Sequence, residues 1–135
     1  MEKQQNKYEL KLLLLKKARL ELLKLHKLLV DIERENYEKD NGKITGGQFL
    51  HLLVNDANFS WLRKFSTLIV EIDEMLDLDD GYTENMIEKQ FSQMRNLLGL
   101  EIADEDFKTK YRNVLQNNSE VAGKHSELKN LLAKK

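Results

Sequence analysis

The sequence predicts an all-α protein, built as an antiparallel helical bundle of four long helices plus one short helix, with a long N-terminal helix. Three observations lead to this prediction. The 135 residues contain no proline, the residue that helix interiors tolerate least. Leucine, lysine and glutamate, which favour helices, are abundant. No segment alternates apolar and polar residues as a half-buried strand would. The length and the lack of a long linker predict a single domain, 1–135.

The first helix is expected from about Gln4 to Lys39, with Gly42 ending it. At ~1.5 Å per residue it would be about 50 Å long, whereas a compact domain of this size has a radius of gyration of ~14 Å. We therefore expect this helix to bend, to break or to project beyond the body. Its main apolar stripe consists of Leu10, Leu14, Ala18, Leu22, Leu25, Leu28, Leu29 and Ile32.

A second set of apolar residues lies on the other side of this helix. Its members are Leu12, Leu20, Leu23 and Val30. A surface helix needs only one apolar stripe to pack on a core. The second stripe predicts that the helix also packs on a partner, and a two-fold homodimer is the commonest assembly. The partner protein, if it is another one, is unknown.

The later helices are predicted from their caps and apolar spacing. Thr45 and Gln48 fit a capping box that opens the short helix, and Asp56 or Asn58 is the next cap. The clearest helix spans about 59–77. Its apolar face consists of Trp61, Phe65, Leu68, Ile72 and Met75, at helical spacing.

Two further helices complete the prediction. Thr83 caps a helix that ends at Gly99, and Asp104 caps a last helix that continues to the C-terminus. Within the last helix, the two asparagines and one serine at 117–119 can break or kink it, because their side chains compete for backbone hydrogen bonds. The sequence leaves the continuity of this helix open.

Composition excludes several classes of protein. The chain has no cysteine, so disulfides, thiolate chemistry and cysteine zinc sites are excluded. Its longest apolar run, Leu12–Leu15, is far shorter than the ~20 residues that span a membrane. The charged N-terminus does not resemble a signal peptide, and we expect a bacterial, cytoplasmic protein.

Two segments carry a family resemblance. Residues 59–74 contain aromatic-x-Trp-Leu-Arg, then Ser-x-Leu-Ile, then Ile-Asp-Glu, and residues 111–125 form a second similar stretch. Together they resemble a family of uncharacterised small bacterial all-helical proteins. That family has a proline near the position of Ser119, and this chain has none. The family has no known function, so the resemblance implies a helical fold and no chemistry.

Two segments invite a cation-binding interpretation. Residues 40–49 look like the second half of an EF-hand loop with Gly42 as its sharp-turn glycine, but the ligand positions would be Tyr37, Lys39 and Gln48. Calcium requires anionic oxygens at those positions, so a helix end followed by a capping box explains the segment better. The acidic turn after residue 72 is similarly explained as a solvated helix end. It contains Asp73, Glu74, Asp77, Asp79, Asp80 and Glu84.

The three histidines, His26, His51 and His125, suggest a metal site only weakly. The sequence has no Glu-x-x-His pair and no His-Glu-x-x-His motif, so we predict neither a metal nor another cofactor. Imidazoles at the edge of the core explain His26 and His125. A small-molecule or metal-binding bundle with a cavity near His51, Trp61 and His125 remains the main alternative.

A catalytic interpretation would use residues of the helix over 59–77. A serine nucleophile requires a base within hydrogen-bond reach, and the sequence places none beside Ser66. No phosphate-binding loop is present either, so we predict that the chain is not an enzyme. The weak candidate pocket comprises His51, Trp61, Arg63, Ser66, Asp73 and His125.

Charge is distributed unevenly along the chain. Basic residues outnumber acidic ones over 1–30, whereas 71–88 contains acidic residues and no basic one. A lysine-rich helix could bind nucleic acid, but lysines without arginine clusters or interleaved aromatics are poor evidence for it. Complementary charge between neighbouring helices or subunits explains the same pattern. The leading interpretation is a non-enzymatic interaction or scaffold protein of unknown role that associates through its first helix.

Overall fold

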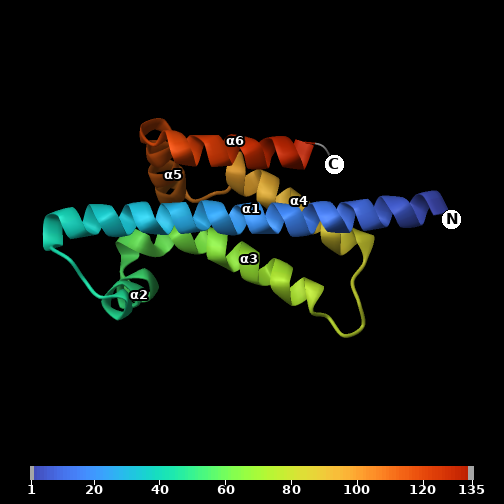
Figure 1. Ribbon diagram of the computed structural model, residues 1–135, viewed down its shortest axis with the longest axis horizontal. Coiled ribbons are helices and arrows are strands. Elements are labelled where there is room, and N and C mark those ends of the chain that lie inside the picture. The colour runs from blue at the N-terminus through green and yellow to red at the C-terminus, as the bar shows by residue number, and fades with distance from the viewer. Residues whose placement is uncertain (1, 134–135) are drawn as a thin grey trace.

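The prediction of an all-α protein is confirmed. The structure is a computed structural model that describes residues 2–133, with side chains from Lys7 onward, and every regular element in that range is helical (Figure 1). In chain order the elements are α1 (Glu2–Asn41), α2 (Gly46–Asn55), the 3₁₀ helix η1 (Ala57–Leu62), α3 (Arg63–Leu76), α4 (Glu84–Leu98), α5 (Glu105–Asn117) and α6 (Ser119–Ala133).

Helix α1 is one unbroken helix of 40 residues. At ~1.5 Å per residue it is about 60 Å long, and its N-terminal end extends beyond the other helices in Figure 1. Of the three expected outcomes, projection beyond the body is the one observed. The helix ends where Gly42 adopts a φ of 82°, a conformation that costs glycine little.

The other helices pack around α1. It contacts α3, α4 and α6, and Figure 1 shows α3 and α6 on either side of it with α4 behind. The colour gradient shows that α3 and α6 run opposite to α1, whereas α4 runs in the same direction. Helix α1 is therefore the element on which three other helices pack, and they cover one side of it.

The buried stripe of α1 differs from the predicted one. Its fully buried members are Leu15, Ala18, Leu22, Leu25 and Leu29. Leu10, which was predicted to belong to it, is 66% exposed. The buried positions recur at alternating spacings of three and four because α1 is covered along one side by three helices. Leu15 was assigned to neither predicted stripe, yet it lies in the core.

The predicted N-caps are confirmed at three helices. Thr45 Oγ1 accepts a hydrogen bond from the amide of Gln48 at 3.1 Å, and Gln48 Oε1 accepts one from the amide of Thr45 at 2.9 Å. Thr83 caps α4, and the Asp104 carboxylate accepts from the amide of Phe107 at 3.0 Å at the start of α5. Each cap satisfies an amide that has no partner within its helix.

The predicted number of helices is wrong at the C-terminal end. The last helix is two helices, and Figure 1 shows α5 at a steep angle to α6. Asn118 separates them with an extended backbone, at φ −134° and ψ 110°. Its side-chain oxygen accepts from the amide of Val121 at 3.0 Å, so it caps α6. The competing hydrogen bond therefore breaks the helix.

The predicted helix over 59–77 also differs at its start, because it begins as η1, which Asp56 caps.

An aromatic cluster joins η1 and α3 to α5 within the core. The ring of Phe65 lies 5.7 Å from that of Phe107 and 5.3 Å from that of Tyr111, between centroids. Trp61 packs on the same two rings of α5. Because these residues are far apart in sequence, the cluster fixes the position of α5 against the rest of the fold.

No helix in the described range is both long enough and apolar enough to cross a membrane.

Candidate functional site

The side of α1 that faces away from the core carries exposed leucines. Leu13 is 63% exposed, Leu20 is 47% exposed and Leu23 is 39% exposed. At 3.6 residues per turn, Leu13 and Leu20 lie roughly opposite the buried stripe. Of the predicted interface residues, Leu20 and Leu23 are therefore exposed, whereas Leu12 and Val30 are half-buried and pack against the core.

An exposed valine on α3 extends this apolar surface. The side chain of Arg19 pairs with that of Asp73, which fixes the register of α1 against α3. The two helices run in opposite directions, so Leu23 and Val70 both lie about one turn from this ion pair, at the same level. Val70 is 52% exposed. We call this surface the outer patch, which consists of Leu10, Leu13, Leu20, Leu23 and Val70.

Lysines lie between the leucines of the outer patch. Lys24 pairs with Glu21 at 3.4 Å, and Lys27 pairs with Asp31 at 3.1 Å, between nitrogen and oxygen. Lys16 and Lys17 are exposed, and neither forms an ion pair with any side chain that the structure describes. On α1, the apolar surface is therefore flanked by positive charge.

Negative charge gathers at the C-terminal end of α3. The exposed acidic residues there and in the following turn are Glu71, Glu74, Asp77, Asp79 and Asp80. By the same register, Asp77 lies one turn beyond the Arg19–Asp73 ion pair, at the level of Lys16. The outer surface thus has a basic half on α1 and an acidic half on α3.

Much of the uneven charge is neutralised within the chain. Lys11 Nζ lies 2.6 Å from Glu84 and 2.9 Å from Glu88, and Arg19 pairs with Asp73. The hydrogen bond to Glu84, and next the one to Glu88, raises the pKa of Lys11 above its usual value. The interpretation of complementary charge between neighbouring helices fits these pairs, because they join α1 to α4 and to α3.

The structure does not bring the polar residues of the predicted pocket together. His51 is exposed on α2, where its Nδ1 lies 3.1 Å from the side-chain nitrogen of Asn55. Arg63 donates to the carbonyl of Val54, at the C-terminal end of α2. Ser66 donates to the carbonyl of Arg63 at 3.3 Å, within its own helix. Asp73, the other polar residue of the predicted pocket on α3, forms the ion pair with Arg19 of α1. Each group thus has a structural partner of its own.

Of the remaining two predicted residues, Trp61 belongs to the core and His125 is half-buried at its edge. Trp61 is buried in the aromatic cluster, and its indole N–H forms no hydrogen bond of normal geometry. His125 Nδ1 lies 2.7 Å from the hydroxyl of Tyr111. Burial lowers the pKa of His125, the nearby charge of Lys129 lowers it further, and burial raises the pKa of Tyr111. The imidazole is therefore neutral, and its Nδ1 accepts a hydrogen bond from the phenol or donates one to it according to the tautomer.

The segment that resembles half an EF-hand is held by side-chain hydrogen bonds. The Glu38 carboxylate accepts from the amide of Ile44 at 2.9 Å and lies 3.7 Å from the guanidinium of Arg34. In the part of the chain that the structure describes, no three His, Asp or Glu side chains are grouped so that they could hold a metal ion.

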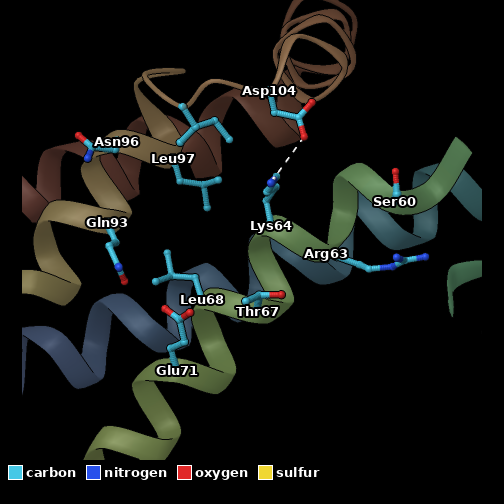
Figure 2. Close-up of a pocket in the computed structure, with 11 residues that line it drawn as sticks. Ser60, Arg63, Lys64, Thr67, Leu68, Glu71, Gln93, Asn96, Leu97 and Asp104 are labelled. Atoms are coloured by element: carbon cyan, nitrogen blue, oxygen red, sulfur yellow. Dashed lines mark ion pairs between the residues drawn. The ribbon is translucent and has the colours of Figure 1, made fainter. Parts of the chain in front are cut away.

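A groove between α3 and α4 was not predicted. One part of it, of about 500 Å³, lies beside Leu68 and Leu97, and a second part, of about 330 Å³, lies beside Met75 and Gln90. Glu71 and Gln93 line both parts. Figure 2 shows Gln93 extending from α4 toward α3, with Leu68 and Glu71 opposite. A glutamine at position 90, between Ile87 and Met94 on the apolar face of α4, is the sequence signal that could have revealed it.

No protein-family model, curated protein or solved structure matches this chain.

Proposed function

We propose that this chain is a non-enzymatic helical interaction protein, an antiparallel bundle that forms a homodimer in the cytoplasm through the outer patch. The observation that carries the proposal is the row of exposed leucines on α1, on the side opposite the core. Burial of apolar surface contributes ~25 cal/mol per Å², so burying these exposed leucines against a second copy favours association.

Charge favours one particular arrangement of the two copies. A two-fold axis parallel to α1 would lay α1 of each copy over α3 of the other and would preserve the level of each residue along the helices. Leu23 would then lie over Val70 of the second copy, and Lys16 over Asp77 of the second copy. Apolar surface would meet apolar surface, and the basic half would meet the acidic half.

The alternative pairing of α1 with α1 is less favourable. In an antiparallel pair centred between Lys16 and Lys17, Leu10 would face Leu23 of the other copy, and Leu13 would face Leu20. The leucines would match, but Lys16 and Lys17 would meet the same lysines of the other copy. Like charges at an interface oppose association, so we favour the arrangement of α1 on α3.

The test is the oligomeric state of the purified chain. Sedimentation velocity from about 1 to 100 μM should show a concentration-dependent dimer, because that range spans a typical dissociation constant for a reversible interface. Leu23→Glu should shift the chain to monomer by placing a charge in the apolar contact. Leu50→Glu is the matched control, because Leu50 is 61% exposed on α2, outside the outer patch. A wild-type monomer at every concentration would refute the proposal, as would equal effects of the two variants.

A further inference from the structure

We propose that Asn41 is a site of spontaneous covalent modification, at which the chain deamidates and isomerises to isoaspartate through a cyclic imide with Gly42. The isoaspartate then loosens the end of α1, the part of that helix that holds α2. The inference is independent of the dimer, because this junction contains none of the residues of the outer patch.

The reaction needs only these two adjacent residues and water. The backbone nitrogen of Gly42 attacks Cγ of Asn41, the Cγ–Nδ2 bond breaks, and the side-chain amide leaves as ammonia with the proton that the backbone nitrogen gives up. Water then opens the imide ring. Attack of water on Cγ breaks its bond to the ring nitrogen and yields aspartate. Attack on the main-chain carbonyl carbon breaks the other bond to the ring nitrogen and yields isoaspartate.

The surroundings of Asn41 favour ring closure. It is the only asparagine of the chain that is followed by glycine, which has no Cβ to shield its amide nitrogen. A Cβ placed on Gly42 would meet no atom within 4 Å, so the neighbouring structure leaves this position open as well. Both residues are exposed. The imide ring and the attacking water therefore have space here.

Two hydrogen bonds must break before the ring can close. Asn41 Nδ2 donates to the carbonyl of Tyr37 at 3.0 Å, and the amide of Gly42 donates to the carbonyl of Glu38 at 2.9 Å. Both hydrogen bonds lie at the last turn of α1, and helix ends open at little cost in free energy. These bonds therefore slow the reaction in the folded chain without preventing it.

Asn117 provides an internal comparison. It is also the last residue of its helix, it is exposed, and its Nδ2 donates to the carbonyl of Asn113, four residues earlier, at 2.8 Å. The residue that follows is different. Gly42 has a φ of 82°, whereas Asn118 has a side chain and a φ of −134°. A difference in rate between the two asparagines therefore reports the effect of the residue that follows.

The product disturbs the contacts that hold α2. Isoaspartate adds one carbon atom to the main chain and places a carboxylate at the C-terminal end of α1, where the helix dipole opposes negative charge. Beyond it, the Ile44 amide donates to the Glu38 carboxylate at 2.9 Å, and the Ile44 carbonyl accepts from Arg34 at 2.8 Å. Figure 1 shows α2 at the end of this connection. The longer main chain displaces Ile44 from these partners, so α2 opens more often.

The test incubates the full chain at mildly alkaline pH and follows both asparagines by mass spectrometry with electron-transfer fragmentation, which distinguishes aspartate from isoaspartate. We expect deamidation at Asn41 to be at least about 10-fold faster than at Asn117, with isoaspartate among the products. Gly42→Asn copies the sequence around Asn117 and keeps a residue that tolerates positive φ. It should slow the reaction by at least about 10-fold without changing the helical circular dichroism signal. Equal rates at the two asparagines, aspartate as the sole product, or an unchanged rate in Gly42→Asn would overturn the proposal.

Amide hydrogen exchange of the incubated chain tests the effect on α2. We expect exchange to become at least about 10-fold faster in α2 and to stay unchanged in α6. Asn41→Gln is the matched control, because it keeps the amide but would have to form a larger ring. After the same incubation, this variant should exchange as it did before. Equal exchange of the wild-type α2 before and after incubation would refute the effect of the modification on α2.

Discussion

The hydroxyl of Tyr111 lies 2.7 Å from Nδ1 of His125, and this hydrogen bond joins α5 to α6 at the edge of the core. Tyr111 is fully buried, so its hydroxyl depends on this imidazole for a partner. Only the neutral imidazole can accept the hydrogen bond, because both ring nitrogens of the protonated form are donors. In the tautomer whose Nδ1 accepts, protonation of His125 therefore reverses the direction of this hydrogen bond between the last two helices.

Acid should destabilise the fold through two half-buried imidazoles. Burial lowers the pKa of His125 and also that of His26, whose ring lies 6.4 Å from that of Phe65. Below the usual histidine value of about 6.5 the unfolded chain therefore binds protons that the folded chain does not. Stability is complete above that pH and falls as the pH drops toward the folded pKa, by at most about 1.4 kcal/mol per histidine for each pH unit.

Urea unfolding at a series of pH values between about 7.5 and 5 measures this effect. His125→Gln keeps an acceptor for the Tyr111 hydroxyl but cannot titrate, so it should reduce the loss of stability in acid. A pH dependence identical to that of the wild type would show that His125 does not contribute.

Two leucines of α1 should differ sharply in their contribution to stability. Leu22 is fully buried, so Leu22→Ala should lower the free energy of unfolding by about 3 kcal/mol through lost burial and a cavity. Leu13 is 63% exposed, and Leu13→Ala should lower it by less than about 0.5 kcal/mol. Chemical denaturation at a concentration where the chain is monomeric measures both values. Similar losses in the two variants would mean that the buried face of α1 is assigned incorrectly.

The local parts of this fold could be predicted from sequence. The side chains of Thr45, Thr83 and Asp104 cap amides only three residues away, so a short window of sequence contains the whole interaction. By contrast, a short window of sequence cannot decide whether Leu10 or Leu15 lies in the core. That depends on where α3, α4 and α6 cover α1, and those contacts join residues that are far apart in the chain.

The candidate site could also be predicted only in part, because contacts between distant parts of the chain decide which of its residues lie together. Two of the predicted interface residues, Leu20 and Leu23, are exposed, because the helical period alone places them away from the core. The predicted pocket grouped residues by type and by helical face. Whether His51 approaches Ser66 depends on the packing of α2, which the sequence does not specify. The groove between α3 and α4 likewise requires knowledge of which helices are neighbours.

The ion pair between Arg19 and Asp73 should contribute more to stability than an ordinary helical pair. It joins two helices, and the guanidinium engages both carboxylate oxygens, an arrangement that adds strength and orientation. A double-mutant cycle with Arg19→Met and Asp73→Asn should give a coupling energy of about 1 kcal/mol. The control is Lys27 with Asp31, an exposed pair on one helix, whose coupling should be about 0.3 kcal/mol. Equal couplings would contradict the proposed role of the pair in setting the register.

The dimer arrangement makes a charge-swap prediction of its own. If Lys16 lies over Asp77 of the second copy, Lys16→Glu creates two repulsive contacts per dimer, because the two-fold axis repeats each contact. We expect about 10-fold weaker dimerisation from Lys16→Glu, and a similar loss from Asp77→Lys, at low salt. The double variant restores opposite charges and should regain most of the lost affinity. Sedimentation equilibrium measures the constants, with Lys43→Glu as the exposed control outside the interface. Additive losses in the double variant would exclude this arrangement. A stronger dimer from Lys16→Glu alone would instead favour the pairing of α1 with α1, in which the substitution removes like charges.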